Sequence, residues 1–147
     1  MSSDLYPAGI PRFNHVAMSV SADLLDVDGR AALVDFHQQV YGFTELTEMT
    51  VDRERLVLSC CDYQQFIFLI VEDTPMVAPR LDHYGLSVSS KADFDACYER
   101  ARVAAAADPR VDLIAPKFDD FEVLKLHSFY VGFLLPLMIE IQYWEFT

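Results

Sequence analysis

Two histidines, His15 and His83, occupy the same position in a nine-residue segment that occurs twice in the sequence. The segments Arg12–Val20 (RFNHVAMSV) and Arg80–Val88 (RLDHYGLSV) share Arg, His, Ser and Val at equivalent positions. Similarity of this extent at such a separation indicates an internal duplication. Because imidazole can exchange protons and bind other groups near neutral pH, these two residues are the first candidates for chemistry.

Both segments alternate in the manner of β-strands, whose side chains point to opposite faces in turn. On the face of each histidine, the residues that follow are small: Ala17 and Ser19 in the first segment, Gly85 and Ser87 in the second. A strand that faces a packed core would have bulkier side chains there. We therefore predict that each histidine lines a cavity. The alternative is a pair of buried, hydrogen-bonded core histidines.

A third chemically capable residue, Glu140, interrupts an apolar strand near the C-terminus. Alternation places Glu140 and Gln142 on one face of this strand, and apolar or aromatic residues on the other (Leu137, Ile139, Ile141 and Tyr143). A carboxylate within an apolar strand is costly unless it is paired or bound to a cation. The alternative is an edge-strand carboxylate that faces water.

The elements that position these residues follow the same order in both halves of the chain. In the first half, after an irregular segment 1–11, we predict strands at about 12–20, 43–49, 55–60 and 65–71 and a helix over 30–41 that Gly42 caps. In the second half we predict strands at about 80–88, 111–115, 122–130 and 137–144, and a helix that follows the capping pair Ser90 and Asp93 and ends before Pro109.

The expected fold class is α+β, with two βαβββ modules at 1–79 and 80–147 in one domain spanning 1–147. A four-stranded sheet with a single helix leaves one sheet face uncovered, so the two modules must pack together or curl around something. The remaining histidines, His37 and His127, are expected at structural, half-buried or exposed positions.

Composition narrows the class of protein. The chain has 147 residues, of which 52% are hydrophobic, enough for a substantial core. Acidic residues outnumber Lys and Arg by 23 to 11, and the net charge of −12 argues against binding to nucleic acid or to an anionic membrane. Three cysteines without regular spacing favour a reduced, cytoplasmic setting. Neither a signal peptide nor a membrane span is expected.

Two βαβββ modules that each open on His-x-[Ala/Gly]-[Met/Leu]-Ser-Val resemble the vicinal oxygen chelate superfamily. This superfamily includes glyoxalase I, extradiol ring-cleaving dioxygenases, fosfomycin-resistance proteins and bleomycin-binding proteins. The resemblance covers essentially the whole chain, and it implies a curled sheet that forms a cup with the helices outside. It also implies one divalent metal ion on His15, His83 and Glu140. Two imidazoles and a carboxylate favour Fe(II) or Mn(II) and also suit Zn(II), Ni(II) or Co(II).

The strand before Glu140 resembles one subgroup more closely. The residues His127-Ser128-Phe129-Tyr130 end ten positions before Glu140, similar to extradiol dioxygenases, in which such a tyrosine hydrogen-bonds the bound catecholate. The resemblance implies a catalytic role for Tyr130 as a proton donor or orienter. The alternative is an ordinary strand tyrosine.

The chain departs from the family pattern at two places. Phe68 matches Glu140 when the modules are superposed in sequence, and its strand is apolar, so this strand supplies neither a further ligand nor a general base. We predict that Phe68, Gln142 and Trp144 line the pocket. The turn 133–136 is apolar (Phe-Leu-Leu-Pro), and an apolar turn is expected to be covered, with a partner subunit in a homodimer as the suggested cover.

The leading hypothesis is a divalent-metal-dependent enzyme for a small molecule that chelates the metal through two adjacent oxygens, most similar to an extradiol dioxygenase. A glyoxalase-like isomerase or lyase is an alternative within the enzymes. A non-catalytic small-molecule-binding protein of the bleomycin-resistance type is the alternative from another class. A structural protein with a vestigial pocket is the third.

Overall fold

The computed structural model describes residues 8–62 and 64–147, so residues 1–7 of the expected irregular segment 1–11 lie outside the described residues. The first half contains β1 (His15–Val20), η2 (Ala22–Leu25), α1 (Val27–Tyr41), β2 (Thr44–Glu45), β3 (Arg55–Ser59) and β4 (Phe66–Val71). The second contains β5 (His83–Ser87), α2 (Lys91–Ala107), β6 (Val111–Asp120), β7 (Leu124–Phe133) and β8 (Met138–Phe146). No helix in the described ranges is long and apolar enough to span a bilayer.

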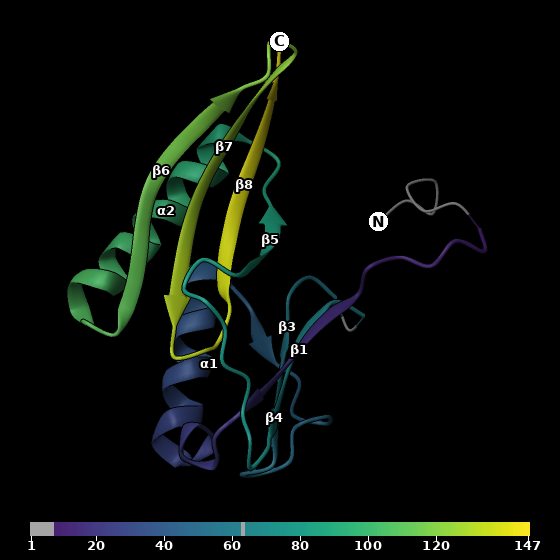
Figure 1. Ribbon diagram of the computed structural model, residues 1–147, viewed down its shortest axis with the longest axis vertical. Coiled ribbons are helices and arrows are strands. Elements are labelled where there is room, and N and C mark those ends of the chain that lie inside the picture. The colour runs from purple at the N-terminus through teal and green to yellow at the C-terminus, as the bar shows by residue number, and fades with distance from the viewer. Residues whose placement is uncertain (1–7, 63) are drawn as a thin grey trace.

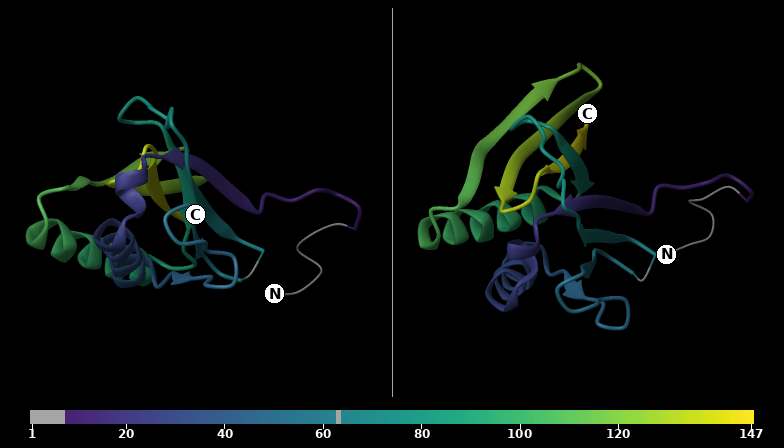
Figure 2. Two further views of the ribbon diagram at one scale, coloured as in Figure 1. Left: turned by 90° about the horizontal axis from the view of Figure 1, so that it is seen from below. Right: turned by 60° about the horizontal axis from the view of Figure 1, so that its bottom comes forward.

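The two halves form two four-stranded mixed sheets with the same topology. The strand orders are β1-β4-β3-β2 and β5-β8-β7-β6. In each sheet the opening strand pairs in parallel with the closing strand, and the other pairs are antiparallel. The α+β class with two βαβββ modules is therefore confirmed. Figures 1 and 2 show that the sheets stay separate and do not close into one cup.

One hydrophobic core joins the two modules. The helix α1 packs against α2, and Phe36 of α1 contacts Phe133 of β7 with ring centroids 4.3 Å apart. The guanidinium Nε of Arg100 in α2 donates to the Val40 carbonyl of α1 at 2.9 Å. In Figure 1, α2 lies along one face of the second sheet. Because the helices cover the inner face of each sheet, the other face of each sheet is left open.

These open faces are the ones that display the candidate site residues. The surface formed by His15, Ala17, Phe66 and Phe68 is the open face of the first sheet, and all four residues are exposed or half-buried. We call the open face of the second sheet the surface of His83, Gly85, Glu140, Gln142 and Trp144. On the opposite, inner faces Met18, Ile67 and Leu69 of the first sheet and Ile139 and Ile141 of the second are buried.

The helix α1 begins at Val27 rather than at the predicted Arg30. Asp26 caps it, because its side chain accepts a 2.8 Å hydrogen bond from the backbone N–H of Gly29. A Cβ at Gly29 would lie 2.2 Å from the Leu24 carbonyl oxygen, so only glycine permits η2 to approach so closely. The glycine lowered the expected helix propensity at this end, and for that reason the predicted start was wrong.

The predicted caps of the other helix ends agree with the structure. Gly42 has φ of +74° and its backbone N–H bonds to Gln38. The hydroxyl of Ser90 accepts from the backbone N–H of Asp93 at 3.0 Å, as the capping-box spacing predicted.

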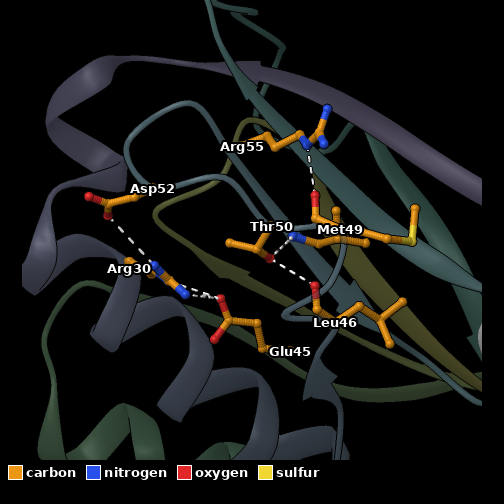
Figure 3. Close-up of polar contacts among 8 residues, drawn as sticks. Arg30, Glu45, Leu46, Met49, Thr50, Asp52 and Arg55 are labelled. Atoms are coloured by element: carbon orange, nitrogen blue, oxygen red, sulfur yellow. Dashed lines mark hydrogen bonds and ion pairs between the residues drawn. The ribbon is translucent and has the colours of Figure 1, made fainter.

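The strand predicted over 43–49 is reduced to the two residues of β2. After Glu45 the chain leaves the sheet and uses side chains to satisfy the edge of β3 (Figure 3). The Thr50 hydroxyl donates to the Leu46 carbonyl at 3.0 Å and accepts from the Val57 N–H at 3.2 Å. Arg30 anchors the start of this loop through a 2.5 Å ion pair with Glu45. An exposed edge is thereby blunted without a full strand.

The strand β6 is twice as long as predicted, because it continues past Pro116 to Asp120. Its pairing with β7 shifts between Ile114 and Lys117. An edge strand tolerates a proline, which has no N–H for the ladder, and the irregularity accommodates it.

The apolar turn 133–136 is covered by its own chain. Leu134 and Leu135 are half-buried and pack against the core. They also line a shallow hollow together with the segment 75–78. The expectation that this turn is covered is confirmed, but the cover is intramolecular, so the turn gives no argument for a partner subunit.

His37 was expected at an exposed or half-buried position and is instead buried, with 2% of its surface exposed. Its Nδ1 contacts the Leu33 carbonyl oxygen at 2.7 Å. Desolvation by burial lowers the pKa of His37 to about 4. The buried face of α1 is wider than its Leu33, Phe36 and Val40 residues indicated, and His37 lies on it beside Phe36, Tyr41 and Phe43.

Candidate functional site

Glu140 lies at the centre of the open face of the second sheet. Strand register places it between Gly85 of β5 and Tyr130 of β7. The residue is buried, with 7% of its surface exposed. Its carboxylate Oε1 accepts from the Tyr130 hydroxyl at 2.9 Å, and its Oε2 accepts from the Gln142 amide at 3.0 Å. A buried carboxylate with two neutral donors still requires a positive partner.

His83 provides the next contact. Its Nε2 lies 3.2 Å from Glu140 Oε2, and its Nδ1 lies 2.8 Å from the Leu81 carbonyl oxygen. A carbonyl oxygen can only accept, so Nδ1 bears the proton of the neutral ring and Nε2 has the lone pair. A lone pair and a carboxylate oxygen at this distance need a cation between them. That cation is either a proton, which gives an ion pair, or a metal ion.

Tyr130 completes a compact group with these two residues. Its ring meets the His83 ring edge to face, with centroids 5.1 Å apart. Desolvation by burial and, next, the hydrogen bond to Glu140 raise the pKa of the Tyr130 phenol above its usual value. The phenol is thus a proton donor beside the carboxylate. His83, Tyr130 and Glu140 therefore contact one another on the second sheet.

Gln142 and Trp144, which were predicted to line the pocket, form consecutive hydrogen bonds that end at Glu140. The Trp144 indole N–H donates to Gln142 Oε1 at 3.1 Å, and this fixes the amide so that its NH₂ group faces Glu140. Sequence analysis missed this positioning role. The only indication was the spacing of Glu140, Gln142 and Trp144, which share one face of β8 at every second residue.

The small residue predicted beside His83 leaves open space at Glu140. A Cβ on Gly85 would meet Glu140 Oε2 at 3.9 Å, an ordinary contact distance. The sheet therefore has room at this point that packing does not require. A metal ion or ligand atom could reach the carboxylate and His83 Nε2 from that side.

His15 lies on the open face of the first sheet, apart from this group. Its ring stacks on Phe66 at 4.9 Å with planes 8° apart, and its Nδ1 lies 2.5 Å from Asn14 Oδ1. Phe68 lies on the same surface, paired with Ala17. Within the described residues of one chain, no three His, Cys, Asp or Glu side chains converge to hold a metal. The structure brings His83, Glu140 and Tyr130 together and leaves His15 and Phe68 on the other sheet.

The register supports the equivalence of Phe68 and Glu140. Ala17, two residues after His15, is paired with Phe68, and Gly85, two residues after His83, is paired with Glu140. The first sheet thus has an apolar side chain at the position where the second has its carboxylate.

The chain matches no family model and no curated protein, but solved structures match it over most of its length. The fosfomycin resistance protein FosX of Listeria monocytogenes matches with 14% identity over 90% of both chains and a TM-score of 0.60. A FosX variant complexed with Mn(II) and 1S,2S-dihydroxypropylphosphonic acid matches with a TM-score of 0.61 at 15% identity, over 90% of this chain and 91% of that one.

Two further similar structures have other descriptions. A glyoxalase/bleomycin resistance protein/dioxygenase from Alicyclobacillus acidocaldarius is 17% identical, with 88% and 89% coverage and a TM-score of 0.59. A lactoylglutathione lyase from Agrobacterium tumefaciens is 15% identical, with 93% and 94% coverage and a TM-score of 0.59. These are vicinal oxygen chelate proteins, and the chain has their fold. The resemblance seen in the sequence is confirmed at the level of the fold.

Proposed function

We propose that the protein is a divalent-metal-dependent enzyme for a small molecule with two adjacent oxygens. The observation that supports this most directly is the 3.2 Å contact between His83 Nε2 and the buried Glu140 carboxylate. Both atoms are acceptors in the neutral-ring state, and a divalent cation satisfies both at once. Fe(II) and Mn(II) suit this donor set, as do Zn(II), Ni(II) and Co(II).

The histidine orientations support the same assignment. In both histidines Nδ1 faces an oxygen, the Leu81 carbonyl for His83 and the Asn14 side chain for His15. Metal-binding histidines usually donate their other ring N–H in this way, which fixes the ring and directs the free nitrogen to the metal. His15 is therefore our third ligand, with its Nε2 available on the open face of the first sheet.

We infer that His15 reaches the metal from a second copy of the chain in a homodimer. The shared core holds both helices inside, so the two open faces of one chain do not cover each other. Both also expose large apolar side chains, with Phe13 78% and Phe146 72% exposed. Contiguous exposed apolar surface favours association. The first open face of one subunit would then cover the second open face of its partner.

The chemistry follows from the residues around the carboxylate. A divalent ion at this place supplies Lewis-acid stabilisation of an enolate or catecholate oxygen. Tyr130 donates a hydrogen bond and can orient a substrate oxygen or supply a proton. Gln142 and Trp144 hold the Glu140 carboxylate in one orientation. Extradiol-type ring cleavage of a catechol, with Tyr130 as donor, is the specific activity proposed, because the Ser128-Phe129-Tyr130 strand before Glu140 resembles that subgroup.

A non-catalytic binding protein is the second candidate. It is favoured by the apolar lining of the open faces, where Trp144 is 45% exposed beside Gln142, and by the absence of a base at Phe68. Such a protein would hold an aromatic ligand without metal.

Metal analysis of the protein purified without chelator tests the proposal. We expect stoichiometric metal in the wild type and loss of metal in His83→Ala. Glu145→Gln, on the strand of Glu140 but on its opposite face, is the control. Oxygen consumption with catechol then tests the specific activity. Metal-free wild-type protein that binds an aromatic ligand would instead favour the binding protein.

A complementation experiment tests the shared site. His15→Ala and Glu140→Gln are each expected to lose metal. Co-expressed with different tags and purified as a heterodimer, they should regain half of the wild-type metal, since one of the two sites is intact. Ligands supplied within one chain predict no recovery.

A further inference from the structure

A cavity of about 570 Å³ lies between the two modules, outside the Glu140 centre. Its walls come from β1, β4 and β5, from the end of α1, and from α2. Of the three proposed metal ligands only His15 lines it, whereas His83 and Glu140 do not. The volume falls within the range of small-molecule sites in proteins.

Three residues that line this cavity each have a buried polar atom without a partner among the described residues. The Tyr41 hydroxyl, the Tyr84 hydroxyl and the Gln65 Oε1 atom are each buried without a hydrogen bond. All three residues line the cavity. Folded proteins satisfy the large majority of their buried polar groups, so three unpartnered atoms around one cavity need an explanation.

The surroundings of these atoms favour a neutral ligand. Burial raises the pKa of the Tyr41 and Tyr84 phenols, and raises the pKa of the adjacent Cys60 thiol to about 12, so none of them ionises near pH 7. Arg100 also lines the cavity, but its Nε donates to the Val40 carbonyl. The remaining wall has apolar side chains (Val16, Phe43, Ile67, Leu86 and Ile141) and a few polar ones (Asn14, Ser87 and Asp93), and the Asp93 carboxylate already accepts from the Ser90 hydroxyl.

We propose that this cavity binds a neutral aromatic or alicyclic small molecule that bears a primary-amide-type group. Its carbonyl oxygen would accept hydrogen bonds from the Tyr41 and Tyr84 hydroxyls, and its N–H would donate to Gln65 Oε1. Its ring would lie against the apolar wall. Neither His83 nor Glu140 lines this site, although His15 and Gly85 of the two open faces do.

Benzamide is the simplest probe with this chemistry, and toluene is its matched non-polar counterpart. NMR titration of the full chain with benzamide should give saturable shifts at cavity residues such as Leu86. Toluene should bind more weakly. Glu140→Gln should bind benzamide as the wild type does, which separates this site from the metal centre. The absence of saturable shifts, or equal affinity for the two probes, would overturn the proposal.

Variants that remove one polar atom at a time test the contacts. Tyr41→Phe and Tyr84→Phe should each weaken benzamide binding by about fivefold to tenfold, the worth of a neutral hydrogen bond. Their melting temperatures should be unchanged or higher, since the hydroxyls have no partner in the free protein. Unchanged affinity in both variants, or a lowered melting temperature that shows hydroxyls already satisfied by bound water, would contradict the proposal.

A blocking variant provides a readout that does not depend on the tyrosines. Ala96 is exposed on α2 and lines the cavity, so Ala96→Trp should fill the entrance and abolish benzamide binding while the protein remains folded. Ala92→Trp, on the exposed surface one turn earlier in α2 and outside the lining, is the matched control and should bind normally. Normal binding by Ala96→Trp would place benzamide elsewhere.

Discussion

The two sheets have the same strand order and the same opening motif, yet their open faces differ in chemistry. In the second sheet, His83 contacts a buried carboxylate that also has a tyrosine and an amide as donors. In the first sheet, His15 stacks on Phe66 and has Phe68 where the second sheet has Glu140. One backbone frame thus supports a polar centre in one copy and an apolar wall in the other.

The comparison teaches that, where strand order and register are the same, the residue type at one position of the closing strand decides what a repeated motif can do. In both parallel strand pairs the histidine lies at the same position of the opening strand. It comes two residues before the residue that is paired with Phe68 or Glu140. The second sheet has a carboxylate, Glu140, within reach of its histidine, whereas the first has Phe68 at that position and His15 stacks on the neighbouring Phe66.

The largest effect is expected from Glu140→Gln, which keeps the shape of the side chain and removes its charge. If the second open face is the metal centre, bound metal should fall below detection, because neither sheet then has a carboxylate at this position. Elemental analysis after purification without chelator measures this. The control Glu145→Gln should retain its metal. Full metal content in Glu140→Gln would contradict the proposal that the metal centre lies on the second open face.

The second prediction concerns the buried titratable group of the first module. The folded-state pKa of His37 is about 4, below the ordinary 6.5, so the unfolded chain binds more protons between these values. The resulting contribution of His37 to the free energy of unfolding is fully present above pH 6.5. It is lost as the pH falls to 4, a total of about 3 kcal/mol.

Chemical denaturation of wild type and His37→Gln at a series of pH values measures this contribution. The difference in unfolding free energy between the two proteins should narrow as the pH falls from 6.5 to 4. A difference that stays constant over this range would mean that His37 remains protonated or solvated in the fold.

The third prediction makes the second sheet resemble the first. Ser87 is paired with Gln142, whereas the equivalent Ser19 is paired with Ile70. Gln142→Ile removes the donor that holds Glu140 Oε2, and loss of such a supporting contact typically weakens metal affinity by about tenfold. A metal-competition titration measures it, and Ile70→Val on the first sheet should have no effect.

The smallest effects are expected at the helix caps, where the modules use different residues for one purpose. Asp26 caps α1 and Ser90 caps α2 through single hydrogen bonds to backbone N–H groups. Asp26→Ala and Ser90→Ala should each reduce the unfolding free energy by about 1 kcal/mol. Thermal denaturation of both variants would show whether the two modules contribute equally to one cooperative transition.

Much of the fold could be predicted because strand alternation and helix caps are local properties. The strand of Glu140 and the equivalence of Phe68 followed from the duplicated motif alone. The strand β2 could not be predicted at its true length, since the Thr50 side chain takes the place of strand pairing at the Val57 N–H of β3. The burial of His37 among Phe36, Tyr41 and Phe43 could not be predicted from the apolar spacing of α1 alone.

The candidate site shows the same contrast: the grouping of residues within one sheet could be predicted, whereas positions that depend on the packing of the two sheets could not. His83, Tyr130 and Glu140 lie on one sheet, so strand register was enough to bring them together. The position of His15 depends on how two sheets pack around α1 and α2, and this is decided by the shared core. The Trp144–Gln142 contact and the unpartnered Tyr41, Tyr84 and Gln65 atoms were also missed, because hydrogen-bond satisfaction emerges only from the folded arrangement.

The parallel pairing of β5 with β8 has a consequence for how the chain acquires its structure. Hairpins between successive strands bring near neighbours together, whereas β5 meets β8 only after α2, β6 and β7 have been arranged between them. Contacts between distant segments have the greater entropic barrier to closure, so we expect the His83–Glu140 contact to be among the last to form. A newly synthesised chain would then assemble the proposed metal centre only at the end of folding.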